Sequence, residues 1–213
     1  MLIGIPVYNK VDLMDVTAPY EIFKWTRDSY GGNVSDFDAV IVAETDEVTS
    51  RDGLTFKAQE RFGSVGQLDV IWVPGGDPTA LAPMMNGTSP NYLAFVRRQS
   101  AKARYVASVC EGALLLAAAH LLDGFEATTH WSFIPCLKEF KAVQVVEGHP
   151  RFVVDRNRIT GGGISSGLDE ALKLVELLTS YEVAQKVQRS IQYYPDPPVA
   201  STIPKPDGCP FSW

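Results

Sequence analysis

The sequence predicts an α/β protein built on a doubly wound, mostly parallel sheet with helices on both faces. Three observations predict this fold class. Short apolar runs with the pattern of buried strands alternate with longer segments of helical pattern. Several of the apolar runs end at turns rich in glycine, proline and aspartate. The chain has 213 residues, 46% of them hydrophobic and 21% charged, with no internal repeat or linker, which indicates a single domain over residues 1–213.

Two predicted strands and a helix open the chain. Leu2–Val7 and Phe37–Ala43 are continuous apolar runs, typical of strands that are buried on both faces of a parallel sheet. Between them we expect a helix over Ala18–Tyr30. Thr17 is its expected N-cap, and Pro19 lies in the first turn, where a missing N–H costs little.

The alternation continues through the middle of the chain. A hairpin is expected over Val48–Gln59, with Arg51-Asp52-Gly53 as its turn. Leu68–Val73 is another apolar strand, which ends at Pro74-Gly75-Gly76-Asp77. Ser89-Pro90 then predicts the start of a helix that runs to about Ala101.

The C-terminal half supplies a strand, a hairpin, three helices and a tail. Tyr105–Val109 is expected to be a strand and Glu111–Ala119 a helix. We expect a short hairpin over Phe152–Thr160 that turns at Arg156-Asn157.

The last two helices have recognisable starts. Ser166 is expected to cap a helix through Leu178, with Asp169 as its acidic capping partner. Ser180 is expected to cap the final helix, which reaches about Tyr193. From about residue 195 the chain is rich in proline, so we expect an extended tail.

Charge and cysteine content exclude several classes of function. The net charge of −6 and a pI near 5.1 argue against attraction to nucleic acid or to an anionic membrane. No apolar run approaches the roughly 20 residues that span a bilayer, and the first residues lack a signal-peptide pattern, so we expect a cytoplasmic protein. The three cysteines are Cys110, Cys136 and Cys209, and no C-x-x-C occurs, so neither a disulfide framework nor a zinc site is expected. Cys136 is interpreted as a packing residue and Cys209 as part of the tail, both with reduced thiols.

Cys110 lies at the strongest functional signal. It follows a buried strand and precedes a helix, and the neighbouring residues Ser108, Gly112 and Ala113 are small. Such a tight strand-to-helix turn is a nucleophile elbow, which exposes one reactive side chain at the end of a sheet. The helix N-terminus would stabilise a thiolate and lower the pKa of Cys110. We therefore predict that Cys110 is a nucleophile rather than a buried core cysteine.

Two further strand ends are expected at the same edge of the sheet. Gly75 and Gly76 follow a buried strand, and their backbone N–H groups, with that of Glu111, would form an oxyanion hole. Asp15 follows the first strand and would act as a general acid and base beside Cys110. From its spacing alone, a solvated loop carboxylate is an equally good interpretation of Asp15.

A glycine-rich segment, Ile159–Gly167, precedes the helix that starts at Ser166. It matches neither of the phosphate-binding patterns G-x-G-x-x-G and G-x-x-x-x-G-K-[ST], so we do not expect a nucleotide there. Gly162, Gly163 and Ile164 are instead expected to form one wall of a pocket. His130 is expected to belong to the same wall. Of the three histidines, it is the only candidate for a catalytic base near Cys110, but a structural, hydrogen-bonding role is favoured for it. With three scattered histidines, no metal is expected.

Taken together, several motifs resemble the ThiJ/PfpI superfamily, within the class I glutamine-amidotransferase-like fold, and most of all its isonitrile hydratases. The resemblance covers about residues 2–199. The motifs that carry it are Asp15-x-x-x-Pro19, Pro74-Gly75-Gly76, Tyr105-Val106-Ala107-Ser108-Val109-Cys110-x-Gly112, Leu121-Leu122-x-Gly124, Ala127-Thr128-Thr129-His130-Trp131, Thr160-Gly161-Gly162-Gly163-Ile164-x-x-Gly167 and Gln192-Tyr193-x-Pro195-x-Pro197-Pro198.

The resemblance implies a flavodoxin-like fold, a homodimer and a small-molecule substrate. It places Asp15 beside the nucleophile. It further implies hydration of an isonitrile to an N-substituted formamide through a thioimidate at Cys110, without a cofactor. The alternatives are glyoxalase-like action on methylglyoxal and a non-enzymatic redox or stress sensor that works by oxidation of Cys110. A regulator's ligand domain is disfavoured, since the chain has no helix-turn-helix segment.

Glu111 departs from the pattern of the superfamily. The hydratases carry Thr after the nucleophile, and PfpI-type proteases carry His, which makes protease activity doubtful. A carboxylate turned into the pocket would oppose thiolate formation and crowd an isonitrile. Because a buried, unpaired carboxylate is costly, we expect Glu111 to turn away, toward a dimer interface or an arginine. On that expectation, replacing Glu111 with Thr changes isonitrile turnover by less than about tenfold.

Overall fold

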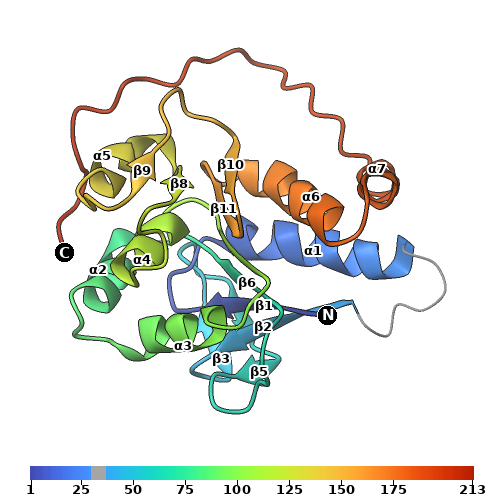
Figure 1. Cartoon of the computed structure of the whole chain (residues 1–213), viewed down its shortest axis with the longest axis horizontal. Helices are drawn as coiled ribbons and strands as arrows, with labels where there is room; N and C mark the ends of the chain where they lie inside the picture. Colours follow the sequence, from blue (N-terminus) through green and yellow to red (C-terminus); the bar gives the residue numbers. More distant parts are fainter. Residues whose placement is uncertain (30–36) are drawn as a thin grey trace.

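A seven-stranded sheet forms the centre of the protein, whose computed structural model describes residues 1–29 and 37–213 (Figure 1). The strand order is β10-β11-β7-β6-β1-β2-β5, and every neighbouring pair is parallel except β10 with β11. The strands are β1 (Leu2–Val7), β2 (Asp38–Ala43), β5 (Glu60–Arg61), β6 (Val70–Val73), β7 (Tyr105–Ser108), β10 (Phe152–Asp155) and β11 (Arg158–Gly161). The predicted α/β fold with a mostly parallel sheet is confirmed.

Helices cover both faces of this sheet, as Figure 1 shows. On one face lie α1 (Leu13–Ser29), α6 (Ser166–Leu178) and α7 (Tyr181–Ser190). On the other face lie α2 (Pro78–Met85), α3 (Asn91–Ser100), α4 (Gly112–Ala118) and α5 (Ile134–Leu137). Among the described residues, no helix is long and apolar enough to cross a membrane, and the cytoplasmic location stays a prediction.

Alternation along the central strands divides the apolar core into two layers. In β6, Ile71 and Val73 pack with the layer of α2, α3 and α4, whereas Val70 and Trp72 pack with the layer of α1 and α6. All four side chains are fully buried. Successive side chains of a strand point to opposite faces, so a continuous apolar run is what a strand between two helical layers requires.

Two two-stranded units lie outside the main sheet, and one predicted hairpin belongs to the main sheet. The predicted hairpin after β2 is confirmed as β3 (Glu47–Thr49) paired with β4 (Thr55–Lys57), and the one at Arg156-Asn157 as β10 paired with β11. No element was predicted at β5, β8 (Glu126–Ala127), β9 (Gln144–Val145), the 3₁₀ turn η2 (Trp131–Phe133) or α5. α2 was not predicted either, because it has prolines at its start and inside it.

The start of α1 differs from the prediction. The helix begins at Leu13, so Thr17 is not its N-cap, and the Thr17 hydroxyl donates to the Leu13 carbonyl one turn earlier. Pro19 therefore lies inside the helix, where it has no N–H to offer the carbonyl of Asp15. The Trp72 indole N–H donates to that carbonyl instead, at 3.0 Å. This bond ties the first turn of α1 to β6. The predicted end at Tyr30 lies outside the described residues.

Two other predicted caps are wrong, and one is confirmed. α3 begins one residue after Pro90 and has no side-chain cap. Asp169 does not cap α6, because its carboxylate binds the guanidinium of Arg151. The Ser180 hydroxyl accepts from the backbone N–H of Val183 and caps α7 as predicted.

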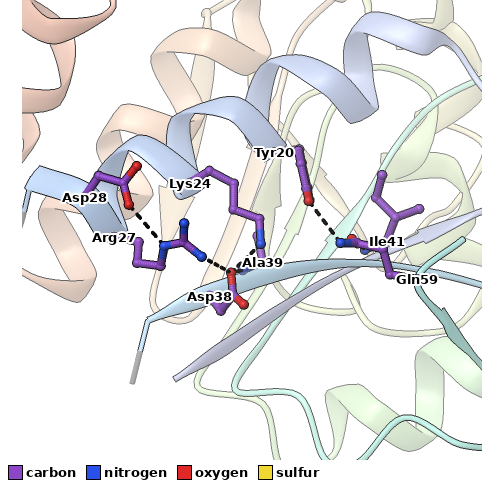
Figure 2. A network of polar contacts seen from close by, with 8 residues as sticks. All are labelled: Tyr20, Lys24, Arg27, Asp28, Asp38, Ala39, Ile41 and Gln59. Atoms are coloured by element: carbon purple, nitrogen blue, oxygen red, sulfur yellow. Dashed lines mark hydrogen bonds and ion pairs between the residues drawn. The ribbon is translucent and has the colours of Figure 1, made fainter. Parts of the chain in front are cut away.

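A polar network joins α1 to the sheet (Figure 2). Lys24 and Arg27 of α1 both pair with Asp38 at the start of β2. Although burial opposes it, the hydrogen bonds from Lys24 and from the Ala39 N–H lower the pKa of Asp38. Further along the helix, the side-chain amide of Gln59 donates to the Tyr20 hydroxyl. α1, which carries Asp15, is thus tied by polar side chains at two places along its length, to the start of β2 and to Gln59.

A disulfide joins Cys136 of α5 to Cys209 of the tail, which corrects the expectation that both are reduced thiols. The two cysteines are 73 residues apart, and their Cα atoms lie 4.7 Å from each other. The tail leaves α7 and runs across the molecule to reach α5, as Figure 1 shows. It has no helix or strand, as its prolines predict, but it is fastened at its end rather than free.

Candidate active site

Cys110 occupies the turn between β7 and α4. Its φ of 57° lies in the left-handed region, which a non-glycine residue adopts only when its surroundings impose it. The Cys110 N–H donates to the Gly162 carbonyl at 2.8 Å, and its carbonyl accepts from the Thr129 hydroxyl at 2.6 Å. A Cβ on Gly112 would lie 2.0 Å from the Val73 carbonyl oxygen, so glycine is needed there. The structure therefore has the predicted elbow geometry.

Asp15 lies in the first turn of α1, the helix that follows β1. Its side chain is fully buried, and its Oδ2 accepts the Gly75 N–H at 2.9 Å. Its other oxygen, Oδ1, is buried with no hydrogen-bond partner. The alternative of a solvated loop carboxylate is therefore wrong. The bond to Gly75 also links the ends of β1 and β6, which is where the strand order reverses direction and where open α/β sheets bind their ligands.

Three carboxyl groups and the thiol of Cys110 meet at this edge of the sheet. One carboxylate oxygen each from Asp12, Asp15 and Glu111 and the Cys110 sulfur all lie within 4.8 Å of one another. An Asp15–Cys110 separation within about 5 Å leaves room for proton transfer directly or through one water. Among the described residues, this is the group close enough to share a metal ion. A metal would have to displace tightly held protons, because the pKa values of Cys110, Asp15 and Glu111 are all raised.

Glu111 points into this cluster, which corrects the expectation that it turns away. It is 4% exposed, and a Cβ on Gly75 would lie 2.4 Å from its Oε2. That Oε2 atom has no hydrogen-bond partner. Helix α4 begins directly after Glu111, and the strained turn at Cys110 directs the Glu111 side chain back across Gly75. The cost of burying this carboxyl is reduced by partial protonation, and the charge of Arg51 makes only a minor contribution.

The pKa of Cys110 is raised well above its ordinary value, not lowered as the helix position predicts. Burial is the largest cause, followed by the charges of Asp15 and Glu111 and by a hydrogen bond to Glu111. The Ile164 N–H opposes the shift. Helix α4 has only seven residues, and its N-terminal field is outweighed by two carboxyl groups and by the loss of water. The resting sulfur is therefore a thiol.

Both carboxyl groups nearest the sulfur also hold protons more tightly than usual. Burial raises the pKa of Glu111 to about 7, against an opposing hydrogen bond with Cys110. Burial, and then the charge of Glu111, raises the pKa of Asp15 well above its ordinary value. Asp15 therefore keeps its proton to a higher pH than an ordinary aspartate does, while Glu111, with a pKa of about 7, is divided at neutral pH between its acid and its carboxylate.

The backbone N–H groups proposed for an oxyanion hole are largely engaged by carboxyl groups. The Gly75 N–H donates to Asp15, and the Glu111 N–H interacts with its own side chain. The Gly76 backbone lies at an isolated bridge to Val11. A substrate can accept hydrogen bonds from these N–H groups only if the carboxyl groups of Asp15 and Glu111 move away.

A cavity of about 340 Å³ lies against the residues that hold Cys110. The four residues predicted to form a pocket wall, Gly162, Gly163, Ile164 and His130, all line it, together with Thr129 and Ile203. The ring of His130 binds the Ser132 hydroxyl and accepts from its N–H, and burial lowers its pKa. These contacts agree with the structural role that was favoured for His130.

Two buried carboxyl groups were not predicted from the sequence. Asp12 is 7% exposed and pairs with Arg51, and burial raises its pKa. Glu170 is fully buried in α6, and a Cβ on Gly161 would lie 2.1 Å from its Oε2. A signal for Glu170 exists: it falls on the apolar stripe of an amphipathic helix, where a charged residue is out of place.

Comparison with known proteins gives the family and a relative of stated activity. The sequence pattern of the DJ-1/PfpI family matches residues 1–177. An isonitrile hydratase from Pseudomonas putida is 39% identical over 203 residues, which is 95% of this chain and 82% of that protein. The transcriptional regulator GbdR of Pseudomonas aeruginosa is 27% identical over 61% of this chain but only 34% of its own length.

Solved structures agree with this relationship. A ThiJ/PfpI family protein from Pseudomonas syringae superposes with a TM-score of 0.81 and 37% identity, over 93% of this chain and 77% of that one. DJ-1 of Schizosaccharomyces pombe, at 20% identity and a TM-score of 0.73, covers 92% of this chain and 100% of its own and shares the fold. The chain belongs to the DJ-1/PfpI family.

Proposed function

We propose that this chain is a cysteine-dependent hydratase that converts an isonitrile and water into an N-substituted formamide without a cofactor. The observation that carries the proposal is the placement of Cys110 on the elbow, with a carboxyl oxygen of Asp15, whose pKa is raised, within 4.8 Å of its sulfur. The isonitrile hydratase relative, 39% identical over 95% of the chain, supports the choice of substrate class.

The first half of the reaction needs an acid and a nucleophile at one carbon. The terminal carbon of an isonitrile takes a proton from Asp15 and becomes electrophilic. The Cys110 sulfur attacks that carbon while its own proton passes to the Glu111 carboxylate, so a C–S bond forms and a thioimidate results. Asp15 is left ionised and Glu111 protonated. Groups that share protons at neutral pH suit this exchange.

The second half returns every group to its starting form. Asp15 removes a proton from a water molecule, whose oxygen attacks the thioimidate carbon, and Glu111 protonates the nitrogen. The C–S bond then breaks, the hydroxyl proton returns to the sulfur, and the formamide leaves. Once the carboxyl groups shift, the N–H groups of Gly75, Gly76 and Glu111 would stabilise the developing charge.

The test is an assay of the purified protein against p-nitrophenyl isocyanide and methylglyoxal, with the Glu111→Thr variant alongside. The proposal expects the native protein to consume the isonitrile and release the formamide. Activity toward the isonitrile only in the Thr variant would show that the inward carboxyl crowds this substrate and that the native substrate is another molecule.

The inward Glu111 favours one second candidate, glyoxalase-like action on methylglyoxal. A hemithioacetal at Cys110 requires protons to move between neighbouring carbons, and two proton-sharing carboxyl groups beside the sulfur suit that step. Turnover of methylglyoxal without turnover of the isonitrile would favour this candidate. Turnover of neither, with ready oxidation of Cys110, would favour a redox sensor.

We also propose that the protein acts as a homodimer, as its resemblance to the family implies. Size-exclusion chromatography with light scattering measures this directly, and a monomer at micromolar concentration would contradict it.

A further inference from the structure

The tail is fixed to the molecule at its far end by more than the disulfide. Phe211 meets Phe133 edge to face, with ring centroids 5.8 Å apart, and Trp213 stacks on Phe140 at 5.5 Å. Together with Cys209, these two tail residues pack against the larger apolar core. A segment without helix or strand is thereby held in one place.

Ile203 of this anchored tail lines the cavity described above, whose lining residues Gly162 and Thr129 are hydrogen-bonded to the backbone of the buried Cys110. Ile203 lines that cavity on one side and a second cavity of about 410 Å³ on the other. Within residues 1–29 and 37–213, His149 is the one other residue that lines both cavities. Ile203 is 54% exposed, so few contacts of its own hold it there, and its position depends on the anchor that follows it.

The anchor is also continuous with the opposite wall of the cavity. The ring of His130, a lining residue, meets Phe133 at 5.9 Å, and Phe133 in turn meets Phe211 of the tail. Thr129, next to His130, donates to the Cys110 carbonyl. One set of contacts therefore connects the nucleophile, the cavity wall and the end of the tail.

We propose that Ile203, held in place by the Cys136–Cys209 disulfide, is a specificity-determining wall that limits the size of the group that reaches Cys110. The inference rests on the proposed role of Cys110 and of this cavity as its approach. For an isonitrile, the limit falls on the substituent carried by nitrogen. Release of the tail joins the two cavities and admits larger substituents.

The disulfide makes this size limit sensitive to reduction by a dithiol. The S–S bond breaks, each sulfur takes up one electron and one proton, and the dithiol is oxidised to its own disulfide. Reduction removes the covalent link, so the end of the tail is then held on the core by packing alone, including the aromatic contacts of Phe211 and Trp213. The reduced protein has a wider entrance to Cys110 than the oxidised protein.

The experiment compares two alkylating reagents at Cys110, iodoacetamide as the small probe and an N-aryl maleimide as the bulky one. Peptide mapping reports the rate at Cys110 separately from the other cysteines. The proteins are the oxidised native chain, the dithiol-reduced native chain, the Cys136→Ser/Cys209→Ser double variant and Ile203→Ala. Val199→Ala is the matched control, because Val199 is a 75% exposed tail residue that lines neither cavity.

The bulky-to-small rate ratio is expected to rise about fivefold or more, equivalent to about 1 kcal/mol, in the reduced chain, the double variant and Ile203→Ala. It should stay unchanged in Val199→Ala. An unchanged rate ratio in Ile203→Ala overturns the proposal. It is also overturned if the ratio rises in Ile203→Ala but not in the reduced native chain. If the double variant fails to fold, the reduced chain and Ile203→Ala decide alone. Alkylation needs no turnover, so this result is independent of whether the isonitrile is the substrate.

Discussion

Glu111 determines how the acidic groups around Cys110 share their protons. Burial raises its pKa from the ordinary 4.5 to about 7. When a carboxyl group has a higher pKa in the folded than in the unfolded state, its ionisation lowers the free energy of unfolding. This loss is absent below about pH 4.5 and grows as the pH rises through about 7. The difference between the two pKa values corresponds to about 3 kcal/mol.

The variant Glu111→Gln removes that ionisation, so it should gain stability relative to the native protein as the pH rises. We expect the difference in free energy of unfolding between variant and native protein to grow by up to about 3 kcal/mol from about pH 5 to pH 8. Urea unfolding at both pH values measures it, with Glu139→Gln as an exposed control. A difference that does not change with pH would show that Glu111 is not held in a buried acidic cluster.

Cys110 should be the only cysteine that iodoacetamide labels in the oxidised protein, because Cys136 and Cys209 are bonded to each other. Its rate should still be rising above about pH 9, since burial and two carboxyl groups raise the pKa of the thiol. Mass spectrometry of quenched samples across pH gives this profile. A rate that levels off below about pH 8 would contradict the raised pKa.

Residue-scale features were predictable where local backbone geometry demands one residue type. The elbow at Cys110 shows itself because the turn needs small neighbours such as Gly112. The direction of the Glu111 side chain was not predictable, because it depends on Gly75, which comes from a different strand. The raised pKa of Cys110 was not predictable either, because it depends first on burial and then on the charges of Asp15 and Glu111.

At the scale of elements, the close approach of α4 to β6 positions the nucleophile. Gly112→Ala would place a methyl group 2.0 Å from the Val73 carbonyl oxygen, which is backbone and cannot rotate away. The start of α4 must then shift, and with it Cys110. We expect the variant to lose about 1–3 kcal/mol of stability and most of its activity.

The matched control is Gly63→Ala, where a Cβ meets nothing within 4 Å. Chemical unfolding and the rate of Cys110 alkylation are measured for both variants. Equal stability of the two variants would show that α4 does not pack as closely on Val73 as described.

Elements were predictable where their signals are local. Both hairpins carry turn residues, and β1 has the predicted bounds because its apolar run is uninterrupted. The start of α1 was placed too late, because Pro19 inside the helix is tolerated only through the bond from Trp72 to the Asp15 carbonyl. That bond joins residues 57 positions apart and leaves no trace in the local sequence.

At the scale of the whole molecule, the Cys136–Cys209 disulfide closes a loop of 73 residues. In the chain-entropy model such a loop stabilises the folded state by about 4 kcal/mol. Reduction should therefore lower the midpoint of urea unfolding, and the Cys136→Ser/Cys209→Ser variant should unfold at that lower midpoint with or without reductant. A midpoint that reduction leaves unchanged in the native protein would contradict a disulfide in the folded chain.

The topology was predictable as a whole, and this cross-link was not. The alternation of strands and helices is read from neighbouring residues, whereas the pairing of two among three cysteines depends on where the tail returns to α5. Spacing along the chain holds no information about that return. The same limit applies to the cavity wall at Ile203, which lies 39 residues beyond Ile164 on the same cavity.

The most direct test of the account is an acid-quenched single turnover with excess protein and an isonitrile, followed by peptide mapping. The thioimidate mechanism predicts an adduct on Cys110 with the mass of one intact isonitrile. The adduct forms before the formamide and decays as the formamide appears. The Cys110→Ser variant should show neither adduct nor product. Formamide produced without a Cys110 adduct, and at an undiminished rate by the Ser variant, would contradict it.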